Sequence, residues 1–177
     1  MGNKITNYKQ TGTIRTERVN FEKYTELSAR FLDEFGVVLP DKGIIQRQNM
    51  KDDELRILCS HFYVSFDYGG HRYSFEFKPA LIWDYCSVPK LLRSLIDNDD
   101  YDAIVAGMIH DYAFNTHRIP FKVANKLFYW LIRQKGGRKL KSALFFAGVA
   151  SPIGRKIYNS KDIKSSWMNA YVDFVIV

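Results

Sequence analysis

The chain has 177 residues, of which 46% are hydrophobic and 25% charged, as expected for one globular domain over residues 1–177 with a substantial core. No apolar run approaches the roughly 18 residues that a membrane span needs. The first ten residues lack the apolar segment of a secretory signal, so we expect a protein that stays in the compartment where it is made. The net charge is +7, and residues 121–177 carry the whole excess, with eleven basic and two acidic side chains.

The first twenty residues are predicted to form a polar arm. Residues 1–20 lack a periodic apolar face, and an edge strand is expected only near residues 11–15. Gly2 followed by Thr6 fits the N-myristoylation pattern. Such a short pattern in a polar arm is more often a chance match than a lipidation site.

Residues 21–50 are predicted to hold one helix and a loop. Apolar residues recur at helical spacing from Phe21 to Phe35, Asn20 can cap the start of this helix, and Gly36 ends it. The following segment contains the turn-forming string 40–43, so a loop or a short strand is expected there.

Residues 55–78 alternate apolar and polar side chains, which predicts β-structure. The apolar face carries Leu58, Phe62, Val64 and Phe66. The sequence 68–71, with two central glycines, predicts a tight hairpin turn, and the aromatic face of the hairpin needs a helical cover. Cys59 and Cys86 form no CxxC pair, so we expect reduced, buried thiols.

Two helices are predicted after the hairpin. Ser87 is placed to cap the first, over residues 88–96, and Pro89 is tolerated in its first turn. The second covers residues 102–115 and is apolar on both faces, which predicts the central helix of the fold. His110 has small residues beside it on this helix, so a neighbouring element can approach it closely.

The last third is predicted to contain helices over residues 121–134 and 138–146 and a strand within residues 165–177. The strand could join the hairpin sheet or extend the sheet of another subunit in a homo-oligomer. Together these elements predict an α+β fold, a small antiparallel sheet packed against four to five helices. The candidate surface for an anionic partner such as nucleic acid consists of Lys122, Lys126, Tyr129, Arg133, Lys139 and Lys141.

The chemistry-bearing residues cluster between residues 83 and 112. Asp84, His110 and Asp111 are the types that bind a divalent metal or act in general acid–base catalysis, and Ser87 is a candidate nucleophile as well as a cap. Adjacent helical residues diverge by about 100°. One of His110 and Asp111 is therefore expected to meet Asp84, and the other to bond to a neighbouring loop. A buried His–Asp pair that only holds a loop on the central helix remains the alternative.

The motifs at these residues resemble a small phage and prophage family, the domain of unknown function 1353. The matching stretches are residues 83–89 (Trp-Asp-Tyr-Cys-Ser-Val-Pro), His-Asp-Tyr at 110–112, and Ala-Asn-Lys-Leu-Phe at 124–128. The resemblance covers roughly residues 70–150. Trp83 stands where the family has Thr, and Asn125 stands where it has a third Asp, which weakens a carboxylate-rich metal centre.

The resemblance implies a phage or prophage protein, in the cytoplasm of an infected host or in the virion, with a family-like core over residues 55–150. Two hypotheses follow. In the first, the chain is a metal-assisted hydrolase that uses Asp84, His110 and Asp111. In the second, it is a non-catalytic virion or accessory protein whose basic last third contacts another chain or nucleic acid.

Overall fold

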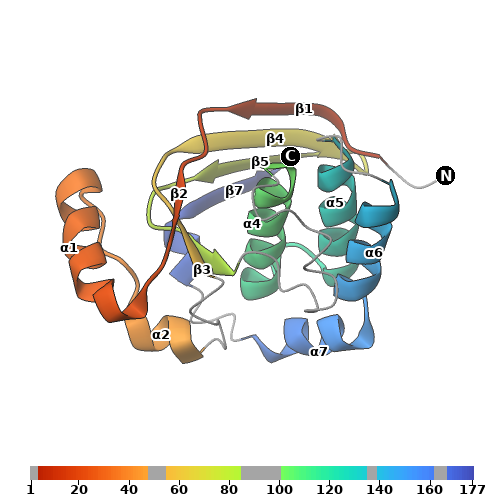
Figure 1. Cartoon of the computed structure of the whole chain (residues 1–177). Helices are drawn as coiled ribbons and strands as arrows, with labels where there is room; N and C mark the ends of the chain where they lie inside the picture. The colour runs from red at the N-terminus through yellow and green to blue at the C-terminus, as the bar shows by residue number, and fades with distance from the viewer. Residues whose placement is uncertain (1–3, 48–54, 85–100, 135–138, 162–166) are drawn as a thin grey trace.

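The computed structural model describes residues 4–47, 55–84, 101–134, 139–161 and 167–177. These residues form six α-helices and two small antiparallel sheets, so the predicted α+β class is confirmed. The larger sheet lies along one side of the molecule, and α4, α5 and α6 lie beneath one of its faces (Figure 1). The predicted helix 88–96 and Ser87 lie outside the described residues. In the part of the chain that is described, no helix is long and apolar enough to cross a membrane.

The larger sheet has the strand order β1-β4-β5-β7 and is built on the predicted hairpin. Its strands are β1 (Thr6–Thr11), β4 (Phe62–Tyr68), β5 (His71–Phe77) and β7 (Val172–Ile176). Gly69 and Gly70 form the turn with φ of 64° and 85°, which glycine adopts without a steric penalty. β7 pairs antiparallel with β5, so the C-terminal strand joins the hairpin sheet of its own chain.

The smaller sheet has the order β2-β3-β6 and positions the first site residue. Its strands are β2 (Thr16–Arg18), β3 (Leu55–Leu58) and β6 (Ile82–Asp84), and Asp84 pairs with Leu55 at the end of the ladder. The segment expected as a polar arm thus contributes β1 to one sheet and β2 to the other. Ile14 and Val19 are buried beside them, an apolar contribution too sparse to give a periodic signal.

Two helices lie at the N-terminal side. α1 (Tyr24–Phe35) follows a short 3-10 turn, Asn20 caps that turn by accepting from the backbone N–H of Glu22, and Gly36 ends the helix with φ of 65°. α2 (Lys42–Arg47) replaces the loop or strand expected after residue 40. Its cause is local, because the Asp41 carboxylate accepts hydrogen bonds from two backbone N–H groups of the first turn.

The helical layer is centred on α4 (Tyr101–Thr116), whose described side chains from Val105 to Thr116 are all buried. α5 (Phe121–Gln134) packs along it, and α6 (Lys139–Val149) extends the layer. α7 (Pro152–Ser160), which was not predicted, begins with Ser151 as its N-cap and a proline in its first turn. Because α4 lies inside this layer, any polar group on it must find its partners within the protein.

Candidate active site

The structure brings Asp84, His110 and Asp111 to the wall of one pocket of about 110 Å³. Asp84 ends β6, and the other two lie in the middle of α4. The pocket lies between α4 and the segment from the end of α6 through α7, with Asp84 at its edge. Asp111 meets Asp84, while His110 bonds to α5 rather than to a loop. Because adjacent helical residues point about 100° apart, Asp111 faces Asp84 while His110 faces α5.

His110 is a buried, neutral imidazole. Its Nε2 lies 3.1 Å from the side-chain oxygen of Asn125, and its ring packs between Phe114 and Phe128, with centroids 4.0 and 4.9 Å away. Since an amide oxygen can only accept, Nε2 carries the proton and Nδ1 keeps a lone pair. Burial lowers the pKa of His110 to about 4, against the opposing effects of Asn125 and the charge of Asp84.

Asp111 is 6% exposed and shares its environment with a second carboxyl group. Burial raises the pKa of Asp111 well above its ordinary range, and the charge of Asp84 and a side-chain hydrogen bond to it raise the pKa further. Lys161 and the backbone N–H of Asp84 act in the opposite direction. Burial and the neighbouring Asp84 therefore both favour the protonated form of the Asp111 carboxyl, because two adjacent carboxylates repel each other.

Several polar atoms around the pocket have no partner among the described residues. They include Oδ2 of Asp111, Oδ1 of Asn115 and Nδ2 of Asn125, all buried. Asn115 uses its Nδ2 to donate to the main-chain oxygen of Asp111 at 2.8 Å. Buried polar groups are nearly always hydrogen-bonded, because each unsatisfied one costs roughly 1–3 kcal/mol. Among the described residues, three of the five buried side-chain atoms without a partner therefore belong to this cluster.

The remaining walls of the pocket come from residues that were not predicted as part of the site. Asn115 follows Asp111 by one helical turn, so helical spacing could have identified it. Ile153 and Ile157 belong to α7 and Lys161 follows that helix. No local pattern in the sequence points to these three, because only the packing of α7 beneath α4 brings them to the pocket.

The metal hypothesis receives no geometric support from the residues described. Within them, no group of three or more His, Cys, Asp or Glu side chains is arranged to hold a metal ion. His110 uses Nε2 for Asn125, and its Nδ1 lies 3.9 Å from Oδ1 of Asp111, a carboxyl that favours its protonated form.

The predicted basic surface is realised only in part. Lys122 and Lys126 are exposed on α5, and Arg133 is half-buried. Tyr129 is half-buried and packs edge-to-face on Phe146 of α6 at 6.1 Å, so it joins the two helices. The side chains of Lys139 and Lys141 lie outside the described part of the structure.

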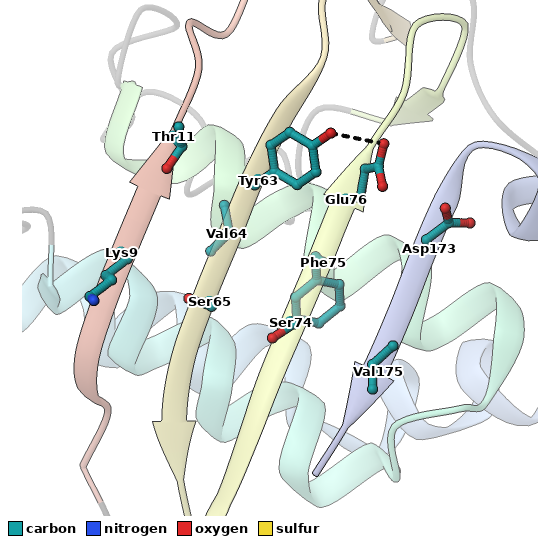
Figure 2. Close-up of a pocket in the computed structure, with 10 residues that line it drawn as sticks. All are labelled: Lys9, Thr11, Tyr63, Val64, Ser65, Ser74, Phe75, Glu76, Asp173 and Val175. Carbon is teal, nitrogen blue, oxygen red and sulfur yellow. Dashed lines mark hydrogen bonds between the residues drawn. The ribbon is translucent and has the colours of Figure 1, made fainter.

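A second hollow, of about 380 Å³, lies on the open face of the larger sheet (Figure 2). Three of the four ionisable side chains that line it, Tyr63, Glu76 and Asp173, bond to one another or to a neighbour. Tyr63 donates to Glu76 at 3.1 Å, and Asp173 lies 2.7 Å from the ammonium of Lys78. The hydrogen bond to Glu76 raises the pKa of Tyr63. None of the residues that line this hollow has a buried side-chain atom without a hydrogen-bond partner, so the hollow differs from the first pocket in this respect.

The single described cysteine offers no alternative nucleophile. Cys59 is half-buried, and burial raises the pKa of its thiol to about 11. A thiol needs a lowered pKa to act as a nucleophile near neutral pH. The reactive chemistry of the described residues is therefore concentrated around Asp111.

The fold and the site define an α+β protein with a carboxyl–imidazole cluster between its central helix and a small sheet. Residues 62–149 match the model of the family described as Protein of unknown function (DUF1353), so this part of the chain belongs to that family. The resemblance predicted from the motifs is confirmed, and the match runs from β4 to the end of α6. No curated protein and no solved structure matches the chain.

Proposed function

We propose that the protein is a hydrolase in which the Asp84–Asp111 pair performs general acid–base catalysis on an acyl substrate. The observation that carries the proposal is the buried carboxyl of Asp111, which lines the pocket, is hydrogen-bonded to Asp84 and has one oxygen, Oδ2, without a hydrogen-bond partner. Two carboxyls that share one proton supply a base and an acid side by side, as in aspartic proteases.

The contact between the two carboxyls also supports a substrate class. Glycoside hydrolases hold their two carboxyl groups roughly 5–9.5 Å apart, on either side of the sugar ring. Here the groups are in hydrogen-bond contact, which leaves no room for a ring between them. An acyl carbon attacked by a water held against the pair fits this arrangement, and an amide is the acyl compound that needs both an acid and a base.

The proposed reaction balances on protein groups alone. Asp84 takes a proton from water, whose oxygen forms a bond to the acyl carbon, while Asp111 gives its proton to the carbonyl oxygen. In the second step Asp84 returns its proton to the amide nitrogen and the C–N bond breaks. Asp111 recovers a proton from the resulting acid. His110, held neutral by burial, accepts a hydrogen bond at Nδ1 and orients the substrate.

The test compares hydrolysis of small amides by the wild-type protein, Asp84→Asn and Asp111→Asn, with Asp173→Asn as a matched control. Asp173 is an exposed carboxylate on the larger sheet, far from the pocket in the fold. We expect either site variant to lower kcat/KM by about a hundredfold or more, the usual contribution of acid–base catalysis. Equal activity of all four proteins, or loss of activity on removal of metal, would contradict the proposal.

The non-catalytic alternative keeps one observation in its favour, the exposed Lys122 and Lys126 on α5. If this face binds nucleic acid, retention on DNA should fall steeply between low and moderate salt, because bound cations are released. The Lys122→Gln/Lys126→Gln variant should then elute at lower salt than the wild-type protein. Identical elution would remove this alternative. A phage or prophage origin remains a proposal that rests on the family resemblance.

A further inference from the structure

The outer side of α7 carries apolar side chains that the fold leaves in solvent. α7 lies at the edge of the molecule opposite the larger sheet (Figure 1). Ile153 is 72% exposed and Ile157 is 42% exposed, and Ile153 is the most exposed large apolar side chain of any described helix. The two isoleucines are four residues apart, so they lie on the same side of α7. With the exposed Pro152 beside them, they form one apolar stripe.

The opposite side of α7 is held against the protein. Gly154 is buried, and a methyl group added there would lie 2.1 Å from the main-chain oxygen of Val149. Tyr158 donates to the main-chain oxygen of Ile119 at 3.2 Å, and its ring stacks on His117 with the centroids 3.9 Å apart. Because these contacts fix the inner side of α7, the apolar stripe cannot turn inward while they persist.

The surroundings of the apolar stripe are basic. Residues 121–161 contain ten lysine and arginine residues and no aspartate or glutamate. On α7, Arg155 and Lys156 are exposed, and Lys156 points about 60° from Ile153 around the helix axis. The guanidinium of Arg155 lies 5.2 Å from the ring of Phe121, the first residue of α5. Cationic side chains therefore border the apolar stripe.

Apolar and cationic groups on one helix favour a lipid surface over the other anionic partners. The phosphates of a nucleic acid would bind the cations but would leave the isoleucines in water. A helix that lies in the plane of a membrane interface buries its apolar side chains at the boundary of the acyl chains. Its lysine and arginine side chains then contact the anionic headgroups. Charge complementarity and the apolar stripe thus agree on an anionic membrane.

We propose that α7 docks the protein on a membrane surface that contains anionic lipid. Ile153 and Ile157 enter the interface, and Arg155 and Lys156 bind the headgroup phosphates. The same two isoleucines line the pocket that contains Asp84, so docking brings the rim of the candidate active site to the lipid. The inference goes beyond the proposed hydrolase function and does not depend on it, because docking requires only the outer side of α7.

The test is sedimentation of the full-length protein with large vesicles, made of phosphatidylcholine alone or of equal parts phosphatidylglycerol and phosphatidylcholine. We expect the protein to bind the anionic vesicles, less tightly as salt rises, and to bind phosphatidylcholine at least about tenfold more weakly. Arg155→Gln/Lys156→Gln should lower the affinity for anionic vesicles about thirtyfold, because each cation near such a surface contributes roughly fivefold. Lys9→Gln/Lys23→Gln removes the same charge from exposed sites outside α7 and should bind like the wild-type protein.

The apolar part of the proposal has its own pair of variants. Ile153→Ser should lower the affinity for anionic vesicles about tenfold, because the isoleucine no longer leaves water on docking. Val38→Ser, which changes a side chain that is 67% exposed after α1, should have no effect. Ser160→Lys adds a cation on the side of α7 that carries Ile153, seven residues away, and should raise the affinity about fivefold. Loss of folding cannot produce such a gain.

Three results would overturn the proposal. The first is equal binding to both kinds of vesicle. The second is vesicle binding that Ile153→Ser leaves unchanged, with retention on DNA that depends on Arg155 and Lys156, which would assign this surface to nucleic acid. The third is an absence of vesicle binding together with self-association that Ile153→Ser abolishes, which would assign the surface to a second copy of the chain.

Discussion

The neutrality of buried His110 makes a quantitative prediction about stability and pH. Its pKa is lowered from the ordinary 6.5 to about 4 in the folded protein. The two pKa values differ by about 2.5, and a difference of 1 corresponds to about 1.36 kcal/mol. The free energy of unfolding therefore changes by about 3 kcal/mol as His110 titrates. Between pH 4 and pH 6.5, His110 is protonated in the unfolded chain and stays neutral in the folded protein. The contribution of His110 is therefore fully present above pH 6.5 and is lost as pH falls toward 4.

The wild-type protein alone will not reveal this effect, because Asp111 titrates in the opposite direction. Its pKa is raised in the folded state, so its contribution is fully present below the ordinary carboxyl pKa and is lost as pH rises through the raised value. Over the same pH range the two contributions offset each other. The measurable quantity is the difference between the wild-type protein and His110→Gln, whose amide can still donate to Asn125.

The assay is urea unfolding at a series of pH values for the wild-type protein, His110→Gln and the control His71→Gln, which changes an exposed histidine of the hairpin. The stability of the wild-type protein relative to His110→Gln should rise by about 3 kcal/mol from pH 4 to pH 6.5 and stay level above it. The control should follow the wild-type curve. A difference that does not change with pH, or an imidazole that titrates near 6.5 by NMR, would refute the argument for a buried neutral His110.

Three further predictions concern the same region. Asp111→Asn should lose activity. In urea unfolding it should gain stability relative to the wild-type protein as pH rises, because the amide does not ionise. A loss of stability at every pH would favour a purely structural pair. Asn125→Asp should raise the pKa of His110, measured by NMR titration, because a carboxylate would replace the amide oxygen 3.1 Å from Nε2. Gly154→Ala should cost about 2–3 kcal/mol in urea unfolding, because its new methyl group would lie 2.1 Å from the Val149 main-chain oxygen; an unchanged midpoint would show that the turn before α7 yields.

Local patterns in the sequence identified most of the framework. The hairpin follows from alternating residues and two central glycines, and the helices near residues 24–35 and 121–134 follow from apolar residues at helical spacing. α2 and α7 were missed although each has a local cause. Asp41 caps the first, and Ser151 followed by a proline starts the second, but both helices are too short to give a clear apolar period.

The sequence alone determined which residue types form the site. The tertiary structure decided which partners each of them contacts. Asp84, His110 and Asp111 stand out as polar groups in the least polar part of the chain, so the need for partners could be inferred from their neighbours in sequence. The partners themselves could not. Asn125 meets His110 only because α5 packs on α4, and Lys161 reaches the pocket only because α7 lies beneath both. Contacts between distant segments depend on how whole elements pack, and no local periodicity encodes that packing.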